Sequence, residues 1–294
     1  MLDWTCALRY HRAHTPRLAD SESVVTERYG ARPRPTSRAP NGRRGSERTP
    51  ANQSARKALQ MLDYFRAHGC GRLSDLAAHA GLNLATALRF ALALEAQGAL
   101  VRDPATRQYS LGPWVLELAS SLLREQPLLQ RAHAVLVALR DQTGETASLW
   151  VRQGRNRVCV DRVESQHGLR GSVDLGARLP PHRGAAGKVF LATLPPEERE
   201  AVLVEVEREE GISLDALRVE LDQVARQGWA ISVAEREPGV ASVAVPIHDP
   251  RGVVNAALNV SGPIARFTHE RRLAAIPLLQ QAAARLSLYA FPRV

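Results

Sequence analysis

The chain has 294 residues, of which 45% are hydrophobic, so it is long enough for two domains with packed cores. The formal net charge is +9, of which +5 comes from residues 1–53 with ten arginines and five acidic residues, a balance that favours polyanionic partners without specifying one. The three widely spaced cysteines argue against a disulfide framework and a zinc site. The sequence has no apolar run of about 18 residues, which argues against a membrane span, and no signal-peptide stretch, which argues against secretion, so we expect a cytoplasmic protein.

Residues 1–52 are predicted to be a disordered basic tail. Residues 29–52 are crowded with Arg, Pro, Gly, Ser and Thr, and this composition buries too little apolar surface to offset the loss of chain entropy. Two interpretations stay open. The tail is either an arm that binds DNA or an upstream stretch included by a misplaced start codon.

Residues 53–112 have the order of a winged helix-turn-helix. A helix from about Ser54 is followed by a pair of helices separated at Gly81, a residue type that commonly ends helices in the left-handed conformation. Ser74 is predicted to cap the first helix of the pair, and Asn83 the second, which runs to about residue 97. The second helix of such a pair can enter the major groove of DNA.

A hairpin and a linker helix are predicted next. Extended runs at 99–102 and 107–111 surround an Asp-Pro turn and predict a β-hairpin with Arg102 and Arg107 beside its tip, where they can meet phosphates. Residues 113–126 are predicted to form an apolar linker helix, which Pro127 interrupts.

Residues 127–294 are predicted to form an α/β sensor domain, because helical and strand-like segments alternate there. The predicted helices cover residues 128–143, 185–193, 214–227 and 276–289, and a further helix starts at residues 195–196. The predicted strands cover residues 146–151, 157–163, 169–173, 229–233, 241–247 and 253–260.

Six stretches in this order carry a family resemblance: LSDLAAHAGL, ALEAQGALVRDPATRQYSLG, GETASLWV, LPPHRGAAGKVFLA, QGWAISVAEREPGVASVAVPI and ALNVSGPIARF. From about Ser54 to Tyr289 the chain resembles IclR-type transcriptional regulators. The resemblance implies an α+β protein of two domains, with an N-terminal winged helix-turn-helix, a linker helix and a C-terminal GAF-like α/β effector-binding domain. It also implies double-stranded promoter or operator DNA and a small organic effector as partners, and a homodimer or homotetramer.

The positions that would read DNA depart from the family pattern. Where the family usually has Pro, a basic residue and Ser before a Thr, and often a His after it, this chain has Asn83, Leu84, Ala85 and Leu88. Leu84, Leu88 and Leu92 form an apolar stripe, and leucine cannot make the paired hydrogen bonds that discriminate bases. The candidate DNA-contacting residues are Ser74, Asn83, Thr86, Arg89, Arg102 and Arg107.

The departure leaves two functions open. The leading hypothesis is a DNA-binding regulator controlled by an effector, which reads DNA through its wing, through Asn83 and Arg89, and through DNA shape. The alternative is a small-molecule sensor in which the winged helix serves protein interaction, with weak or no specific DNA binding.

The resemblance also places an effector pocket at the start of the helix at residue 185 and on the facing strands. Small residues at a helix N-terminus leave free amides that can hold a carboxylate, and residues two apart on a strand share a face. Leu149 and Trp229, together with Val243, are expected to approach the cavity, which suggests an aromatic or aliphatic acid as the effector. The candidate effector residues are Ala185, Ala186, Ser232, Ser242, Asn259, Ser261, Leu149 and Trp229.

Catalysis is not expected. His182 is predicted to order a loop, Lys188 to be structural or exposed, and Cys159 to lie in the core. The sequence contains no arrangement of nucleophile, base and orienting group, and no metal-ligand spacing. We therefore expect no enzymatic activity, cofactor or metal.

Overall fold

The computed structural model describes residues 52–171 and 173–289. The predicted basic tail therefore lies outside the described residues, apart from its last residue. Among the described residues, no single helix has the length and apolarity to cross a membrane, and only α2 (Leu73–Ala80) and α3 (Leu84–Ala96), which are bent by 106° at their junction, meet that test jointly.

The winged helix-turn-helix forms much as predicted. It begins with α1 (Gln53–Asp63) and a short 3-10 turn, followed by α2 and α3. Gly81 ends α2 in the left-handed conformation with φ of 60°, and the Asn83 side chain caps α3 by accepting the Thr86 N–H at 2.8 Å. The predicted cap at Ser74 is wrong. Helix α2 already starts at residue 73, because Arg72 takes the cap position and donates its N–H to the Asp75 carboxylate at 2.9 Å.

The predicted hairpin is present as β1 (Leu100–Arg102) and β2 (Tyr109–Leu111), which pair antiparallel. The Asp103 side chain holds the turn by accepting the N–H groups of Ala105 and Thr106 at 2.7 and 3.0 Å. The hairpin shares a small core with the three helices, because Leu100 and Tyr109 are buried against side chains of α1, α2 and α3.

Helix α4 (Pro113–Glu125) is the predicted linker, and α5 (Pro127–Thr143) follows it. Gln126 between them has an extended backbone, and Pro127 occupies the first turn of α5, which is why one helix ends and another begins there. Within the part of the chain that the structure describes, α4 buries none of its residues.

The C-terminal domain is built on a curved antiparallel sheet. Over residues 127–171 and 173–289, six strands pair in the order β5-β4-β3-β8-β7-β6. They are β3 (Thr146–Gln153), β4 (Asn156–Val163), β5 (Arg178–Leu179), β6 (Ala230–Val233), β7 (Val240–His248) and β8 (Val254–Pro263).

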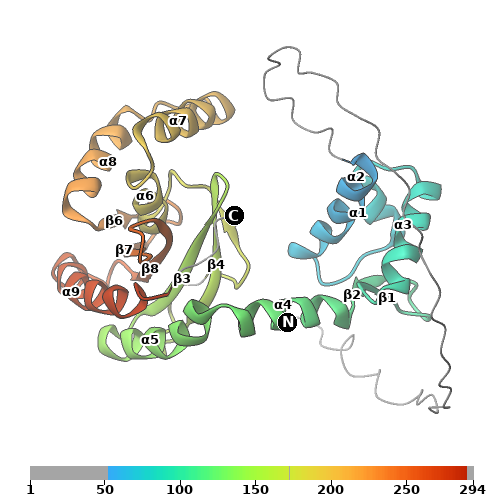
Figure 1. Cartoon of the computed structure of the whole chain (residues 1–294), viewed down its shortest axis with the longest axis horizontal. Coiled ribbons are helices and arrows are strands. Elements are labelled where there is room, and N and C mark those ends of the chain that lie inside the picture. Colours follow the sequence, from blue (N-terminus) through green and yellow to red (C-terminus); the bar gives the residue numbers. More distant parts are fainter. Residues whose placement is uncertain (1–51, 172, 290–294) are drawn as a thin grey trace, which may run out of the picture. The chain divides into compact units, whose positions relative to one another are not determined.

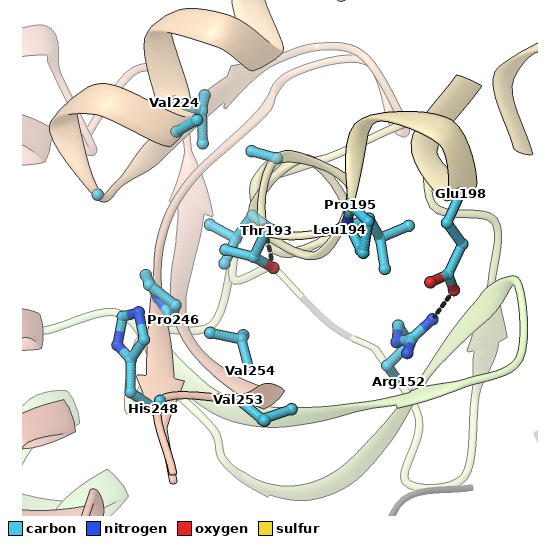
Figure 2. Close-up of a pocket in the computed structure, with 15 residues that line it drawn as sticks. Arg152, Thr193, Leu194, Pro195, Glu198, Val224, Pro246, His248, Val253 and Val254 are labelled. Atoms are coloured by element: carbon cyan, nitrogen blue, oxygen red, sulfur yellow. Dashed lines mark hydrogen bonds and ion pairs between the residues drawn. The ribbon is translucent and has the colours of Figure 1, made fainter. Parts of the chain in front are cut away.

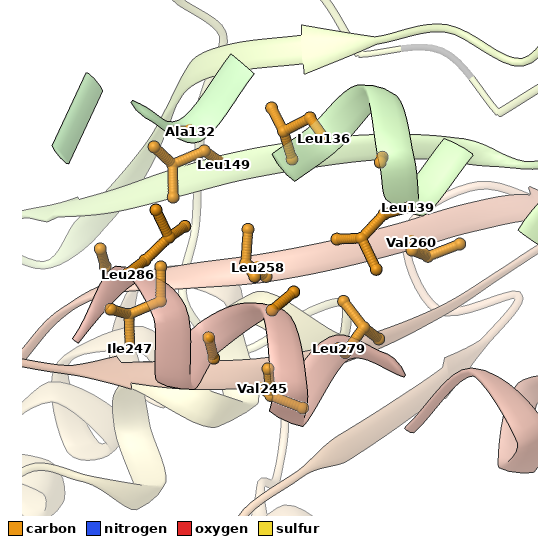
Figure 3. Packing of buried hydrophobic residues seen from close by; sticks show 14 of the residues in the cluster. Ala132, Leu136, Leu139, Leu149, Val245, Ile247, Leu258, Val260, Leu279 and Leu286 are labelled. Atoms are coloured by element: carbon orange, nitrogen blue, oxygen red, sulfur yellow. The ribbon is translucent and has the colours of Figure 1, made fainter. Parts of the chain in front are cut away.

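Helices cover both faces of the sheet (Figure 1). On one face α5 and α9 (His269–Leu286) pack on alternate residues of β3, β7 and β8, and this forms the larger apolar core (Figure 3). On the other face lies α6 (Ala185–Ala192), backed by α7 (Pro196–Glu210) and α8 (Asp215–Gln227). The sheet thus has two distinct sides, and the parity of a strand residue decides which side it faces.

Two predicted boundaries in this domain are wrong. The described residues of the segment 169–173 form no strand, and the edge strand is instead β5. Helix α9 begins at His269 rather than at residue 276, because Thr268 caps it by accepting the Arg271 N–H at 3.4 Å. Pro277 lies inside α9, so it does not mark the start of the helix.

Candidate functional site

A cavity lies where the N-terminal end of α6 meets the sheet, and we call it the N-terminal cavity. The space open to water in it is about 30 Å³, room for about two water molecules. Six of the eight predicted effector residues line it: Ala185, Ala186, Ser232, Ser242, Asn259 and Ser261. The remaining lining residues are Trp150, Arg157, Val173, Gly184, Arg236, Glu237 and Val240.

The register of the sheet brings the polar residues of this cavity together. Ser232 on β6 pairs with Ser242 on β7, which pairs with Ser261 on β8, so the three hydroxyl-bearing residues form a row across three strands. Asn259 lies two residues before Ser261 on the same face and pairs with Ser148 on β3. Strand alternation therefore directs one polar row toward α6.

The other two predicted residues face away from this cavity. Leu149 and Val243 are fully buried in the core against α5 and α9, and Trp229 packs on the edge of the same core. Leu149 lies between Ser148 and Trp150, so it points to the opposite face of β3. The expectation that Leu149 and Trp229 approach the cavity is wrong.

The N-terminus of α6 is already partly satisfied by the chain itself. The Gly184 N–H donates to a Glu235 carboxylate oxygen at 3.0 Å, and the Ala185 N–H donates to Ser242 Oγ at 3.5 Å. The Gly184 and Ala185 N–H groups are therefore engaged within the chain, and the expectation that amides at this end of α6 hold a carboxylate stays a prediction. The backbone approaches closely here, since a Cβ on Gly187 would lie 2.2 Å from the Pro181 carbonyl oxygen.

Lys188 is a buried structural residue. Its side chain is 3% exposed, and its ammonium group donates to Glu220 Oε1 at 2.6 Å, to the Ile231 carbonyl at 3.0 Å and to the Glu235 carboxylate. One cation thus ties α6 to α8, to β6 and to the loop after β6. The prediction of a structural Lys188 is confirmed, and its exposure is excluded.

Arg157 is the cavity residue that sequence reasoning missed. It is 3% exposed, donates from Nη1 to the Pro180 carbonyl at 2.6 Å, and holds its guanidinium carbon 5.0 Å from the centre of the Trp150 ring. Burial first, and then the nearby Arg236 charge, lower the pKa of Arg157 to about 9, so it stays charged at pH 7. A signal was available, because Arg157 is two residues from Cys159, the predicted core residue, and so shares its face.

A larger cavity of about 540 Å³ lies at the C-terminal end of α6, and we call it the C-terminal cavity (Figure 2). Figure 2 shows Arg152 and Glu198 joined on one side of it and His248 on the other. The Arg152–Glu198 ion pair is 2.9 Å long. The Thr193 hydroxyl donates to the Val189 carbonyl within α6. Arg152 and Glu198 thus neutralise each other here, and no predicted effector residue lines this cavity, so the smaller N-terminal cavity is the better candidate site.

The candidate DNA residues lie on the winged helix-turn-helix. Asn83 and Thr86 stand at the start of α3, where the Asn83 side chain is engaged in its cap, and Arg89 is exposed one turn further. The Arg102 guanidinium carbon lies 5.6 Å from the centre of the Tyr109 ring. Arg107 adopts φ of 59° at the hairpin tip, and Ser74 lies in the first turn of α2.

The predicted leucine stripe of α3 is exposed. Leu84, Leu88 and Leu92 are 58%, 40% and 53% exposed, while Ala87 and Ala91 on the opposite side are buried. In residues 52–171 and 173–289, no group of three or more His, Cys, Asp or Glu side chains is arranged to hold a metal ion.

Comparisons with known proteins match both domains. Residues 54–104 match the IclR helix-turn-helix domain, and residues 120–288 match the family described as bacterial transcriptional regulator IclR C-terminal. The chain is 30% identical over 267 residues to the HTH-type transcriptional regulator BhcR of Paracoccus denitrificans, which covers 89% of this chain and 95% of BhcR.

Solved structures agree with this assignment. A regulator from Alicyclobacillus acidocaldarius superposes with a TM-score of 0.72 at 26% identity, over 80% of this chain and 97% of the other. A homolog from Microbacterium hydrocarbonoxydans, solved with 4-hydroxybenzoate, has the same fold, with a TM-score of 0.68 at 24% identity over 80% and 97% of the two chains. With the winged helix, the sheet and both domain matches in agreement, the chain belongs to the IclR family of DNA-binding transcriptional regulators.

Proposed function

We propose that this chain binds double-stranded promoter or operator DNA through α3 and the β1–β2 hairpin, and that a small organic acid in the N-terminal cavity modulates this binding. The observation that carries the proposal is the row of Ser232, Ser242 and Ser261 facing the start of α6, in a chain whose first domain exposes Arg89 on α3. We infer that the protein acts as a cytoplasmic homodimer or homotetramer and as a regulator rather than an enzyme.

The size of the cavity supports a conformational response. A space for about two waters does not hold an aromatic or aliphatic acid, so such a ligand binds a more open arrangement of the segments around the cavity. A ligand that binds one arrangement better than another shifts the population toward it. The effector would thereby favour one spacing of the recognition helices in the assembly.

A gel shift with the full chain on the DNA upstream of its own gene tests the proposal. With competitor DNA present and salt varied, we expect specific binding by the full chain and by a version starting at Ala51. Arg89→Ala should weaken binding to all sequences and lower the salt slope by about one ion if Arg89 contacts a phosphate. Binding no tighter than to random DNA in moderate salt would contradict the proposal.

The exposed leucines favour a second candidate function. Leu84, Leu88 and Leu92 present apolar surface where a DNA-reading helix usually presents polar groups, so the winged helix would serve protein interaction instead. In that case a variant with Leu84→Arg and Leu88→Gln gains an affinity for DNA that the unsubstituted chain lacks. If the unsubstituted chain already binds specifically in the gel shift, this alternative is excluded.

A further inference from the structure

We propose that Arg157 is the anion-binding residue of the N-terminal cavity, and that the effector presents a carboxylate to its guanidinium group. The inference rests on the proposed effector function of this cavity and goes beyond it, because it names the residue that selects an acid. The geometry that carries the proposal is a buried guanidinium that lines the cavity with an unpartnered Nε and, among the described residues, with no carboxylate at ion-pair distance; Glu235 acts on it only from further away.

The hydrogen-bonding capacity of Arg157 is only partly used. Nη1 donates to the Pro180 carbonyl, whereas the buried Nε has no hydrogen-bond partner among the described residues. Nη2 faces the start of α6, where a Cβ built on Gly184 would lie 2.9 Å from it. Within the described part of the chain, no carboxylate lies within 4 Å of this guanidinium, although a buried charge ordinarily requires a partner.

The second buried cation beside α6, Lys188, is paired with carboxylates of the chain itself. Lys188 is equally buried, and it is met by the carboxylates of Glu220 and Glu235. Leaving a buried cation uncompensated costs free energy that a bound anion would recover. The contrast between Lys188 and Arg157 therefore points to a ligand, rather than the protein, as the source of the missing negative charge.

The acidic groups closest to the cavity are already engaged. Glu235 accepts from Lys188 and from the Gly184 N–H, and Glu237 accepts from Arg236 at 2.9 Å. The N–H of Gly184, which caps α6, donates to Glu235, and the N–H of Ala185, the first residue of α6, donates to Ser242. An incoming carboxylate thus finds an unsatisfied donor at Arg157 Nε, where the positive Arg236 and the negative Glu235 act on the guanidinium in opposite directions.

The geometry also describes the ligand. A guanidinium binds a carboxylate through two parallel N–H donors, which an amide or an alcohol cannot match. The Trp150 ring lies beside the guanidinium, and Val173 and Val240 supply apolar walls. At its volume in this structure the cavity has room only for a very small acid such as formate. A larger acid would make the same interaction with the guanidinium after the cavity has widened.

Formate is therefore the probe for a direct test on the full chain. Thermal unfolding is followed while formate replaces chloride at constant ionic strength, and formamide serves as the uncharged counterpart. We expect a saturable rise in Tm with formate, roughly 3–5 °C for each tenfold increase above its Kd, and no rise with formamide. Arg157→Met should abolish the rise, and Arg157→Lys should leave a weaker one because lysine lacks the planar fork.

Arg155→Met is the matched control. Arg155 lies two residues away, is exposed, and pairs with Glu205 at 2.9 Å on the surface, so its variant should keep the full formate response. An equal response to formate and formamide in the unsubstituted chain overturns the inference, even if Arg157→Met fails to fold. A full formate response in folded Arg157→Met overturns it as well. DNA binding without a formate response would refute the role of Arg157 alone, whereas a formate response without DNA binding would refute the proposed function alone.

Discussion

Replacing Lys188 by methionine should destabilise the C-terminal domain strongly, although the two side chains have similar length. The buried ammonium joins two carboxylates and a backbone carbonyl, and removing one partner of such a buried pair typically costs about 3–5 kcal/mol. The carboxylates of Glu220 and Glu235 are 40% and 30% exposed, so water can partly solvate them after the change. We therefore expect the lower end of this range, about 3 kcal/mol, or a fall in Tm of about 6–12 °C.

Urea unfolding monitored by tryptophan fluorescence measures this loss of stability. Trp150 and Trp229 pack in the two cores on opposite sides of the sheet, so both cores report on the unfolding of the domain. Arg155→Met removes a surface ion pair and should cost about 0–1 kcal/mol. Adding Glu235→Gln to Lys188→Met should recover part of the loss, since one unpaired carboxylate disappears. If Lys188→Met lost less than about 1 kcal/mol, the argument that this ammonium holds α6 in place would be refuted.

Two further predictions concern the packing around α6 and the acid stability of the domain. Gly187→Ala places a Cβ 2.2 Å from Arg157 Nη1 and 2.2 Å from a backbone carbonyl oxygen. Overpacking of this kind should lower the free energy of unfolding, measured in urea, by about 1–3 kcal/mol. The control is Gly168→Ala, whose Cβ meets nothing within 4 Å and which should change the free energy of unfolding by no more than about 0.5 kcal/mol. Hydrogen bonds from Arg218, and then from a backbone N–H, lower the pKa of Glu207 to about 2. The Glu207–Arg218 pair therefore stabilises the folded state above pH 4.5, and this contribution is lost as the pH falls toward 2. Glu207→Gln should make the free energy of unfolding depend less on pH in that window. An unchanged pH dependence would show that the pair does not contribute.

Local signals explain why the elements could be predicted from the sequence. Gly81 and Gly228 each end a helix in the left-handed conformation, and Asn83 caps α3, all within a few residues of the boundary they set. The predicted start of α9 is late because the cap at Thr268 precedes a polar first turn, which lacks the apolar periodicity of the rest of the helix. Helix boundaries can be predicted from a single sequence where the capping residues are of distinctive types.

The candidate site was predicted only in part, because strand parity and pairing register decide it. Ser232, Ser242 and Ser261 meet in one row, whereas Leu149 and Trp229 pack in the core on the other face of the sheet, a difference that their apolar character alone does not reveal. For Trp229 the odd spacing to Ser232 already indicated the opposite face. The missing partner of Arg157 could not be predicted, since it depends on how β4, α6 and the intervening loop pack in three dimensions.

The position of α6 between two cavities matters for any attempt to alter ligand preference. All eight of its residues are buried, and its ends border different cavities: Ala185 and Ala186 the N-terminal one, Val189 and Ala192 the C-terminal one. The helix is only about 12 Å long, and a close-packed interior does not absorb displacement by loosening. If a molecule at one end displaces the helix, the room at the other end changes as well, and any resulting coupling between two compounds is the same in both directions. Variant libraries aimed at one cavity should accordingly be screened with both cavities randomised together.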